Sequence, residues 1–268
     1  MKGILLGQQV AAPKCYAPEL LFPISRTQGR NGLAVGWDAG ADDWTGWEFS
    51  WLEPTGMPEA AVLQLRVPAD SPHIVESKSL KLYLNSLNFT AFDSRQVLLD
   101  TLNADIAGCI GGPVQLDLLP IDSPMLAVQG ALSADCLDLL LPSVMPEGVD
   151  ASVLRVDADQ SQELHVFTRL FRSCCPVTGQ PDWASVHIEH RGAHIAADSL
   201  LAYLLGYRRH QGFHEQCVEQ IFSDVHAVTR SEHLRVSARF LRRGGLEINP
   251  WRSVGEGFST LPGRDARQ

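Results

Sequence analysis

The stretch Phe171 to Trp183 holds the residues best suited to covalent chemistry. Two adjacent cysteines, Cys174 and Cys175, end an alternating segment, and a run rich in Pro and Gly separates them from Asp182. A thiolate is a strong nucleophile, and a neighbouring carboxyl group can manage the proton of such a reaction. Buried cysteines and turn aspartates also occur without catalytic roles, so the spacing by itself leaves a structural role open.

A second polar group opens a predicted helix. His214 and Glu215 stand in its first turn, where a carboxylate commonly serves the helix dipole. A carboxylate there can also accept hydrogen bonds from a bound ligand. His214 and Cys217 have a spacing that suits a metal, but no further ligand pair stands near them, and we expect no metal.

Basic residues in two places could hold phosphate groups. Lys78 and Lys81 fall on a predicted helix, and Arg242-Arg243-Gly244-Gly245 follows a predicted strand. No Gly-x-Gly-x-x-Gly motif follows a strand, which excludes a Rossmann nucleotide site. Without further information, a solvated basic surface explains these residues equally well.

Three motifs follow one another along the chain. Glu76 to Tyr83 reads Glu-Ser-Lys-Ser-Leu-Lys-Leu-Tyr, the stretch Ser173 to Trp183 places Cys175 seven residues before Asp182, and Phe213-His214-Glu215 opens the later helix. Together they resemble the signature, active-site loop and Phe-His-Glu motif of the NADPH-dependent 7-cyano-7-deazaguanine reductases (QueF family). The signature lies in the first half of the chain and the Cys, Asp, His and Glu residues lie in the second half, and this division resembles the bimodular branch of that family.

The resemblance implies roles for individual residues. Cys175 would add to the nitrile carbon to form a thioimide, Asp182 would protonate the nitrogen, and His214 would orient the intermediate. Substrate contacts are implied at Val75, Glu76, Ser77, His214 and Glu215. NADPH contacts are implied at Ser77, Lys78, Arg243 and Gly244. The predicted reaction reduces 7-cyano-7-deazaguanine to 7-aminomethyl-7-deazaguanine in queuosine biosynthesis, a tRNA-modification pathway.

Two alternative functions remain open on the residues alone. A thiol-dependent nitrile hydrolase or amidohydrolase would resolve the thioimide with water and would turn over without NADPH. A non-catalytic module that binds a purine or pterin would keep its ligand function in Cys175→Ala.

Composition restricts the class of protein. The chain has 268 residues, 45% of them hydrophobic, which suits one large or two small globular domains. The net charge of −9 argues against nucleic-acid binding and favours a free small-molecule substrate. The six scattered cysteines suggest no disulfide framework. Apolar runs are too short to span a membrane and no secretory signal is evident, so we expect a cytoplasmic protein.

Periodicity predicts the elements of a first module. Residues 1–43 read as irregular. Alternation predicts strands at 44–52, 63–67 and 114–118. Helices are predicted over 79–87 and from a cap at Asp93 or Ser94 to Gly108, with Val97, Leu98, Leu102 and Ile106 on its buried face.

Residues 119–160 read as a linker with a short strand at Leu137 to Leu141, and a second module follows. Its predicted strands are 164–170, 183–190, 234–240 and 246–248. Its predicted helices run from a cap at Asp198 to Tyr207 and from His214 to Val228. In the strand 234–240, the residues Arg235, Ser237 and Arg239 are expected to face outward.

The order strand-strand-helix-helix-strand thus occurs twice, which indicates an α+β fold. The resemblance implies two tandem T-fold (tunnelling-fold) modules, each an antiparallel sheet with a helix pair on one face. We expect the modules at 1–118 and 161–268 and, because T-fold modules complete barrels by association, a homodimer.

Overall fold

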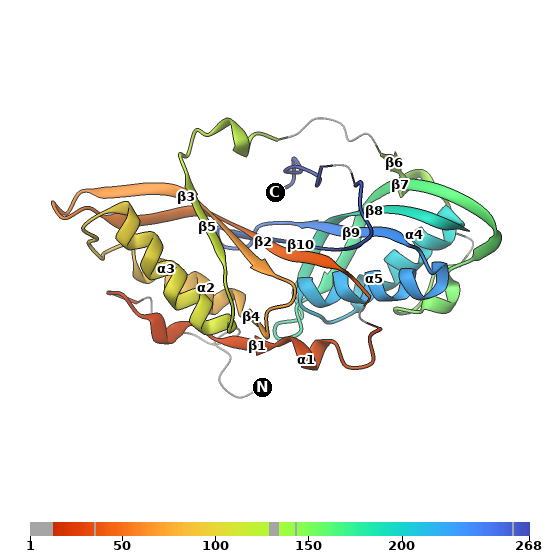
Figure 1. Cartoon of the computed structure of the whole chain (residues 1–268), viewed down its shortest axis with the longest axis horizontal. Helices are drawn as coiled ribbons and strands as arrows, with labels where there is room; N and C mark the ends of the chain where they lie inside the picture. Colours follow the sequence, from red (N-terminus) through yellow and green to blue (C-terminus); the bar gives the residue numbers. More distant parts are fainter. Residues whose placement is uncertain (1–12, 35, 129–133, 143, 259) are drawn as a thin grey trace. The chain divides into compact units, whose positions relative to one another are not determined.

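The computed structural model of the chain describes residues 13–34, 36–128, 134–142, 144–258 and 260–268. The chain divides into two compact units, one of residues up to Gly29, Asp42–Ala127 and Arg242–Glu247, the other of Arg30–Ala41, Val128–Leu241 and Ile248–Gln268. Both combine helices with largely antiparallel strands (Figure 1). No helix in these described ranges is both long and apolar enough to cross a membrane. Residues 1–12 of the expected irregular arm lie outside the described residues.

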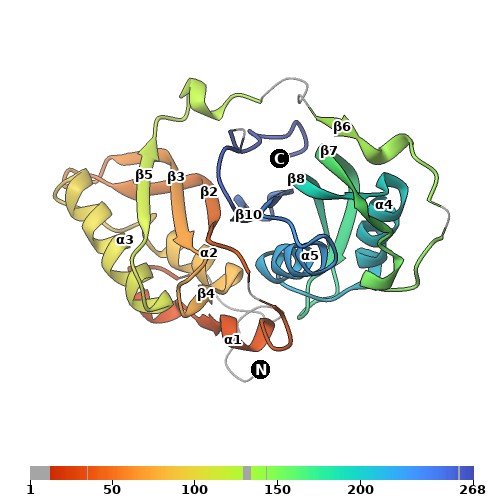
Figure 2. The same ribbon diagram turned by 45° about the vertical axis from the view of Figure 1, so that its right-hand side comes forward.

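The first unit contains neighbouring strands in the order β5-β3-β2 and the helix pair α2 and α3 (Figure 2). Strand β2 (Ala39–Leu52) connects through a tight turn to β3 (Pro58–Pro68), and β3 pairs antiparallel with β5 (Gln115–Leu119). Helices α2 (Ser77–Ser86) and α3 (Arg95–Ile110) come after β3 and before β5 in the sequence. The two helices lie side by side in space (Figure 2). Strands β1 (Pro23–Ser25) and β4 (His73–Val75) form a separate two-stranded sheet, and α1 (Arg26–Gly29) follows β1.

Residues 13–29 are therefore more ordered than the sequence predicted. The prolines and glycines of this segment suggested an irregular arm, but a 3₁₀ turn at Pro18–Leu20, strand β1 and helix α1 follow one another. The pairing partner of β1 lies about 50 residues further along the chain, a separation that local periodicity cannot detect.

Helix α3 begins and ends as capping chemistry requires, although its end was predicted too early. The Ser94 side chain accepts a hydrogen bond from the Val97 amide at 3.2 Å. Gly111, with φ 75°, terminates the helix instead of Gly108. The buried residues repeat every four positions from Leu98 to Ile110, so Val97 falls outside this face and is exposed, contrary to the prediction.

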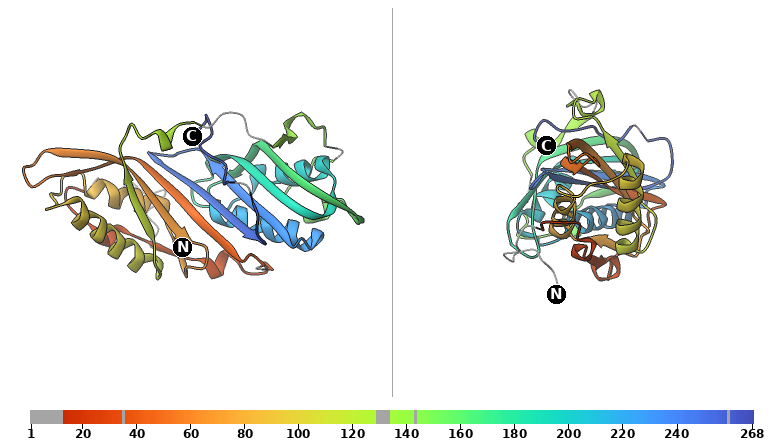
Figure 3. Two further views of the ribbon diagram at one scale, coloured as in Figure 1. Left: turned by 45° about the horizontal axis from the view of Figure 1, so that its top comes forward. Right: turned by 90° about the vertical axis from the view of Figure 1, so that its left-hand side faces the viewer.

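The second unit contains strands in the order β10-β9-β8-β7-β6 with two helices on one face (Figure 3). Its strands are β6 (Asp135–Cys136), β7 (Val156–Cys174), β8 (Pro181–Ile195), β9 (His233–Phe240) and β10 (Leu246–Val254). Its helices are α4 (Ala197–Leu205) and α5 (His214–Thr229), and 3₁₀ turns stand at Leu137–Leu139, Ala151–Val153 and Gly206–Arg209. A further 3₁₀ turn, Pro124–Leu126, belongs to the first unit. All described pairs of strands from β7 to β10 are antiparallel, whereas β6 runs parallel to β7.

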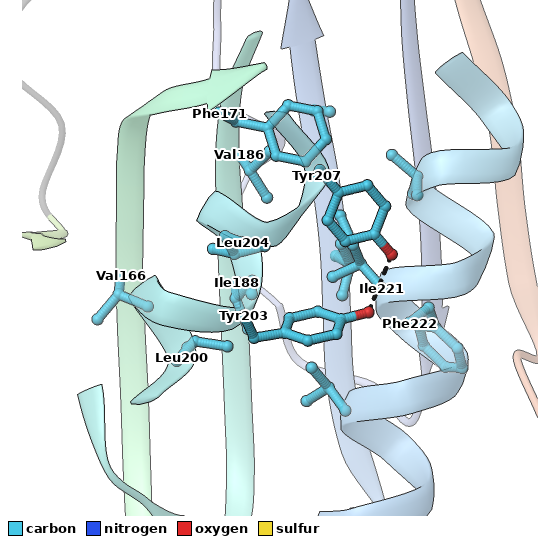
Figure 4. Close-up of a cluster of buried hydrophobic side chains, with 14 of the residues drawn as sticks. Val166, Phe171, Val186, Ile188, Leu200, Tyr203, Leu204, Tyr207, Ile221 and Phe222 are labelled. Atoms are coloured by element: carbon cyan, nitrogen blue, oxygen red, sulfur yellow. Dashed lines mark hydrogen bonds between the residues drawn. The ribbon is translucent and has the colours of Figure 1, made fainter. Parts of the chain in front are cut away.

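The core of the second unit joins α4 and α5 to the strands (Figure 4). Val166 and Ile188 of the strands pack with apolar residues of both helices. Within this core the Tyr203 and Tyr207 hydroxyls lie 2.9 Å apart, and Tyr203 donates a hydrogen bond to Asp224 at 2.6 Å. Both buried hydroxyl groups thus have hydrogen-bond partners, so an otherwise apolar core can accommodate them. This packing holds the first turn of α5 at a defined place beside the sheet.

Two predictions in the second unit are wrong because local hydrogen bonds override the pattern. Leu137 to Leu141 is a 3₁₀ turn and extended chain, and Leu139 and Leu141 are exposed. Asp198 does not cap α4; the N-cap is Ala196, and Asp198 lies in the first turn and pairs with Arg155. A carboxylate in the first helical turn is favourable through the helix dipole as well as through a cap.

Strand β7 departs from strict alternation at a bulge. Its register with β8 shifts between Thr168 and Phe171, so Phe171 is buried and Leu170 is 38% exposed. Asp138 accepts hydrogen bonds from the Thr168 hydroxyl at 2.7 Å and the Arg169 amide at 3.1 Å next to this shift. A bulge places an extra residue on one strand and re-aims the side chains beyond it. The alternation of side chains predicted for Leu164 to Leu170 therefore holds only as far as Thr168, although the strand itself continues.

Strand β9 is covered on both faces. Arg235 and Ser237 were expected to face outward, but both are buried. Arg235 forms an ion pair with Glu189 of β8, and the C-terminal segment lies over the strand, since the Gln268 side chain donates to the Phe240 carbonyl oxygen at 3.0 Å. The C-terminal segment covers this face of β9, which explains why the alternation of residues alone did not predict its burial.

A buried ion network surrounds Glu219 of α5. Its carboxylate accepts hydrogen bonds from Arg252 at 2.6 and 3.2 Å and from Arg30 at 2.7 and 3.0 Å. Arg252 is fully buried, and its guanidinium also donates to the Ala41 carbonyl oxygen at 3.1 Å. Burial alone would raise the pKa of Glu219, but the charges and hydrogen bonds of Arg252 and Arg30 outweigh it and lower that pKa.

Glu219→Gln is expected to destabilise the protein by about 3 kcal/mol, because it leaves the Arg252 charge buried without its counter-ion. The pKa of Glu219 is lower in the folded state, so its contribution is present above the ordinary carboxyl pKa. That contribution disappears as the pH falls through the lowered value. Urea unfolding at pH 7 and at acid pH measures this, and the difference between the two proteins should shrink in acid. An equal difference at both pH values would contradict the ionic origin.

Candidate active site

The Cys–Asp loop is the tip of the β7–β8 hairpin. Ser173 pairs with Asp182 and Cys174 with Pro181, and the Cys175 amide donates to the Gln180 carbonyl oxygen at 2.8 Å. The Gly179 amide donates back to the Cys175 carbonyl oxygen at 2.9 Å, with Gly179 at φ 68° where a side chain would be strained. The seven-residue spacing is thus the length that this hairpin needs.

The hairpin register brings Asp182 close to the end of β7. Asp182 stands directly opposite Ser173 and shares its strand face. Cys175 is the first residue beyond β7, two positions after Ser173. Diagonal neighbours across an antiparallel pair have Cα atoms about 7–8 Å apart, within reach of a small molecule held between their side chains.

His214 joins Asp182 from the first turn of α5. Its Nε2 lies 3.4 Å from Asp182 Oδ1, and its ring stacks on Phe240 of β9 with centroids 3.8 Å apart. The Nδ1 atom is buried and finds no hydrogen-bond partner within the described part of the chain. A buried polar atom without a partner is unfavourable, so Nδ1 is a position where a ligand group would be stabilised.

The two adjacent cysteines differ in their surroundings. Cys174 Sγ lies 3.4 Å from Arg172 Nη1 and 3.7 Å from the Arg208 carbonyl oxygen. Its backbone also bonds to the segment after α4, because its amide donates to the His210 carbonyl oxygen at 2.8 Å. Neighbouring strand residues point to opposite faces, so Cys174 faces away from Ser173, but its thiol is still near enough to Cys217 to raise the pKa of that thiol.

A third cysteine, Cys217, lies buried beneath this group. Burial raises the pKa of the Cys217 thiol to about 12, a hydrogen bond with Ser173 lowers it, and the charges of Asp182 and Glu215 raise it further. These electrostatic effects show that both carboxylates lie near the Cys217 thiol. Cys217 itself is held as a neutral thiol and is poorly suited to be a nucleophile.

The two candidate base-binding carboxylates belong to different units and have different surroundings. Glu215 is buried in the first turn of α5, directly after His214. Glu76 is the N-cap of α2, and its two oxygens accept hydrogen bonds from the Lys78 and Ser79 amides, each at 2.8 Å. The capping role does not exclude a ligand, because each carboxylate oxygen can accept more than one hydrogen bond.

The phosphate-binding candidates of the first unit gather around α2. Ser77 and Lys78 form its first turn, and Lys81 lies one turn later. The Lys81 ammonium lies so close to Gly244 that a Cβ atom at this glycine would overlap it. Gly244 also has φ 61°. The left-handed backbone conformation therefore favours glycine at this position.

An open recess lies at this junction of α2 and the 242–247 segment. Gly244 and Lys81 line it, together with residues from β2 and α2 that sequence reasoning missed, namely Gly46, Glu48, Phe49, Leu84 and Asn85. No local spacing relates these positions to Gly244, so no sequence signal was available. Arg243 is held in the turn by its amide, which donates to the Leu246 carbonyl oxygen at 2.8 Å.

The structure thus brings Asp182, Glu215 and Cys174 near the Cys217 thiol in the second unit, with His214 3.4 Å from Asp182 and Cys175 directly after Cys174 in the chain. It groups Ser77, Lys78 and Gly244 around α2 in the first unit, and Val75 ends β4 just before Glu76. Within the described ranges, no set of three or more His, Cys, Asp or Glu side chains is arranged to hold a metal ion. His214 and Cys217 thus lack further metal ligands among these residues.

Comparison with known proteins shows matches over most of the sequence. Residues 13–118 match the family described as nitrile reductase, 7-cyano-7-deazaguanine-reductase N-term. Residues 181–257 match the family described as QueF-like protein.

Curated relatives match nearly the full length. The chain is 43% identical over 267 residues to the NADPH-dependent 7-cyano-7-deazaguanine reductase of Acinetobacter baumannii, covering 98% of each chain. It is 45% identical over 268 residues to the protein of the same name from Chromohalobacter salexigens, covering 98% of this chain and 96% of that one. A solved structure, the archaeosine synthase QueF-Like in the apo form, is 21% identical with a TM-score of 0.32 and covers 37% of this chain and 96% of its own.

Proposed function

The chain belongs to the family of NADPH-dependent 7-cyano-7-deazaguanine reductases, and we propose how its own residues perform this reduction. The protein is an oxidoreductase of queuosine biosynthesis that converts the nitrile of 7-cyano-7-deazaguanine into a primary amine with NADPH. The observation that carries the residue assignment is the β7–β8 hairpin. Asp182 stands opposite Ser173 in this hairpin, two residues before Cys175, and His214 lies 3.4 Å from the carboxylate, which supports the assignment.

Cys175 acts as the nucleophile. Its thiolate adds to the nitrile carbon, one C–N π bond breaks, and the nitrogen takes a proton to give a thioimide bound to the enzyme. Asp182 delivers that proton as the general acid. His214, stacked on Phe240 and next to Asp182, holds the reacting group in line, and its buried Nδ1 offers the intermediate a hydrogen-bond position. This addition explains why a reductase needs a cysteine, since a bare nitrile accepts hydride poorly.

The residues around α2 fit a dinucleotide with phosphate groups. NADPH, when bound, supplies hydride, and two molecules are needed because nitrile to amine requires four electrons. Lys78 and Arg243 provide positive charge, Ser77 provides a hydroxyl and a helix-terminal amide, and Gly244 allows close approach of backbone to ligand. The recess beside Gly244 and Lys81 lies next to these groups.

The decisive experiment mixes protein, 7-cyano-7-deazaguanine and NADPH and follows the loss of nicotinamide absorbance. Two NADPH consumed per amine formed is the expected stoichiometry. A hydrolase or amidohydrolase would consume the nitrile without NADPH, and a purine- or pterin-binding module would bind the base without consuming either.

Recognition of the base rests on Glu215 and Glu76 in this proposal, with Val75 and Ser77 beside Glu76. A deazaguanine presents N1–H and a 2-amino group, and a carboxylate accepts both. Glu215 is the first choice because its buried carboxylate adjoins His214. Glu76 has the same chemistry, and its position on the N-cap of α2 limits how far it can move.

Glu215→Gln is expected to weaken binding of the nitrile base about five- to hundredfold, because an N–H of the base would face another N–H, at a cost of about 1–3 kcal/mol. Calorimetric titration measures this, and alkylation of Cys175 by a small reagent should stay unchanged. Glu76→Gln is the matched comparison and should also lower the thermal midpoint, since one amide oxygen cannot replace both capping oxygens. Normal base binding by Glu215→Gln with loss in Glu76→Gln would assign recognition to Glu76 alone.

The architecture belongs to the same proposal. We place T-fold modules at 1–118 and 161–268 with 119–160 as the linker. The orders β2-β3-α2-α3-β5 and β7-β8-α4-α5-β9 support a repeated module. We also propose that the protein is a homodimer and is located in the cytoplasm. We propose further that it acts on the free base and not on nucleic acid, which the net charge of −9 supports. Analytical ultracentrifugation tests the dimer.

A further inference from the structure

Three buried hydroxyls on one face of α2 take no part in the reaction described above. Ser79, Tyr83 and Ser86 are spaced four and three residues apart, so they form one stripe along the helix. Each of the three residues is fully buried. Buried hydroxyls require partners, and the partners of this stripe lie on the segment before β1 and on α3.

The two serines bind the N-terminal segment in the same way. Ser79 Oγ accepts from the Phe22 amide at 3.0 Å and donates to the Glu76 carbonyl oxygen at 2.7 Å. Ser86 Oγ accepts from the Ala17 amide at 3.2 Å and donates to the Tyr83 carbonyl oxygen at 2.6 Å. Each hydroxyl therefore links an amide of the segment to a carbonyl group of the helix. We call residues 16–25 the arm.

Tyr83, between the two serines, is tied to the arm through a shared carboxylate. Tyr83 and Tyr16 both donate to Asp105 Oδ2, each at 2.6 Å, and their rings lie 6.4 Å apart. Burial and the Asp105 charge raise the pKa of both phenols far above the ordinary range, so both stay protonated donors. Tyr16, Asp105 and Tyr83 form what we call the latch.

The other end of the arm contacts the residues proposed for substrate binding. The Glu76 amide donates to the Phe22 carbonyl oxygen at 2.9 Å, and Pro23 pairs with Val75 in the β1–β4 sheet. Glu76 in turn caps α2 through the Lys78 and Ser79 amides. The position of the arm therefore bears directly on the backbone of Val75 and Glu76 and on the first turn of α2.

We propose that the latch, with Ser79 and Ser86, clamps the arm along α2 and thereby holds Val75 to Lys78 in the geometry that binds substrate and NADPH. Tyr16, Tyr83 and Asp105 are positioning residues, because they act through Glu76 and the start of α2 without touching a ligand. The inference rests on the proposed function for the identity of the ligands. It also accounts for Ser79 and Tyr83 in the signature motif, which otherwise have no role in the reaction.

Tyr83→Phe removes one latch hydrogen bond and keeps the ring. Hydrogen–deuterium exchange of the full chain should show at least about tenfold faster exchange in the arm, reporting its release. If the competent geometry is then about a tenth as populated, the KM values for NADPH and the nitrile base rise about tenfold. The kcat value should stay nearly constant, because saturating ligands restore the geometry. Saturating NADPH should also restore the arm's protection, as reciprocal coupling requires.

Tyr16→Phe provides a second variant, because its half-exposed ring puts no core packing at risk, and it should shift exchange and KM in the same direction. Gln96→Ala is the matched control, since it breaks an exposed hydrogen bond within α3, from Gln96 to Asp100 at 2.9 Å, and should change neither.

Unchanged exchange in both tyrosine variants would overturn the latch. Faster exchange with unchanged KM values would overturn its positioning role. Lack of NADPH consumption by the unaltered protein would count against the proposed function instead, and the exchange rates would still show whether the latch holds the arm.

Discussion

Protein carrying Cys175→Ala should gain no mass when incubated with 7-cyano-7-deazaguanine in the absence of NADPH, whereas the unaltered protein gains the mass of one base per chain. Only a thiolate can add to the nitrile carbon here, and alanine removes it without enlarging the loop. Without NADPH the thioimide has no reductant and accumulates. Intact-protein mass spectrometry measures the adduct, and peptide mapping locates it.

Cys174→Ala is the matched control for this experiment and should still form the adduct. Its thiol lies 3.4 Å from Arg172 Nη1, and Ser173, not Cys174, lies opposite Asp182 in the hairpin. An adduct on Cys174, or one that survives Cys175→Ala, would show that the nucleophile is misassigned. Loss of the adduct in both variants together would point instead to disruption of the hairpin.

Asp182→Asn should slow adduct formation by roughly 10² to 10⁴, the range typical for loss of a general acid. The side chain keeps its shape, but the amide cannot supply the proton that the nitrogen takes as the thiolate adds. Rapid mixing followed by acid quench and mass spectrometry gives the rate.

Asp198→Asn serves as the comparison, because Asp198 pairs with Arg155 at the start of α4 and lies outside the group around Cys217. It should form the adduct at the normal rate. A near-normal rate in Asp182→Asn would mean that this carboxylate only shapes the hairpin and that another group provides the proton.

The pattern of the chain predicted most elements of the fold correctly. Alternating apolar residues marked the strands that became β2, β3, β5, β7, β8 and β9, and the helix predicted from His214 to Val228 became α5. These predictions succeed because a strand or an amphipathic helix carries its period within a few consecutive residues. The family and its reaction also followed from short motifs, and the curated relatives confirm them.

Other features depended on partners far away in the sequence. Nothing near Pro23 indicates that it pairs with Val75, and nothing near Gly244 indicates the ammonium of Lys81 beside it. The outward face of β9 became buried because the C-terminal segment covers it, although its polar residues suggested solvent. Such contacts cost chain entropy and are decided by the whole fold, so local composition cannot reveal them.

The candidate site likewise has features that the sequence determines and features that only the tertiary structure determines. The residue types and the seven-residue interval from Cys175 to Asp182 are properties of the sequence alone, and they define which chemistry is available. The tertiary structure decided which residue of the hairpin lies opposite the acid, because its register pairs Ser173 with Asp182. It also decided that His214 stands 3.4 Å from Asp182, because the packing of α5 on the sheet sets the direction of its first turn. The sequence determines which reacting groups are present, but the hydrogen-bonded register and the core packing determine how these groups are oriented toward one another.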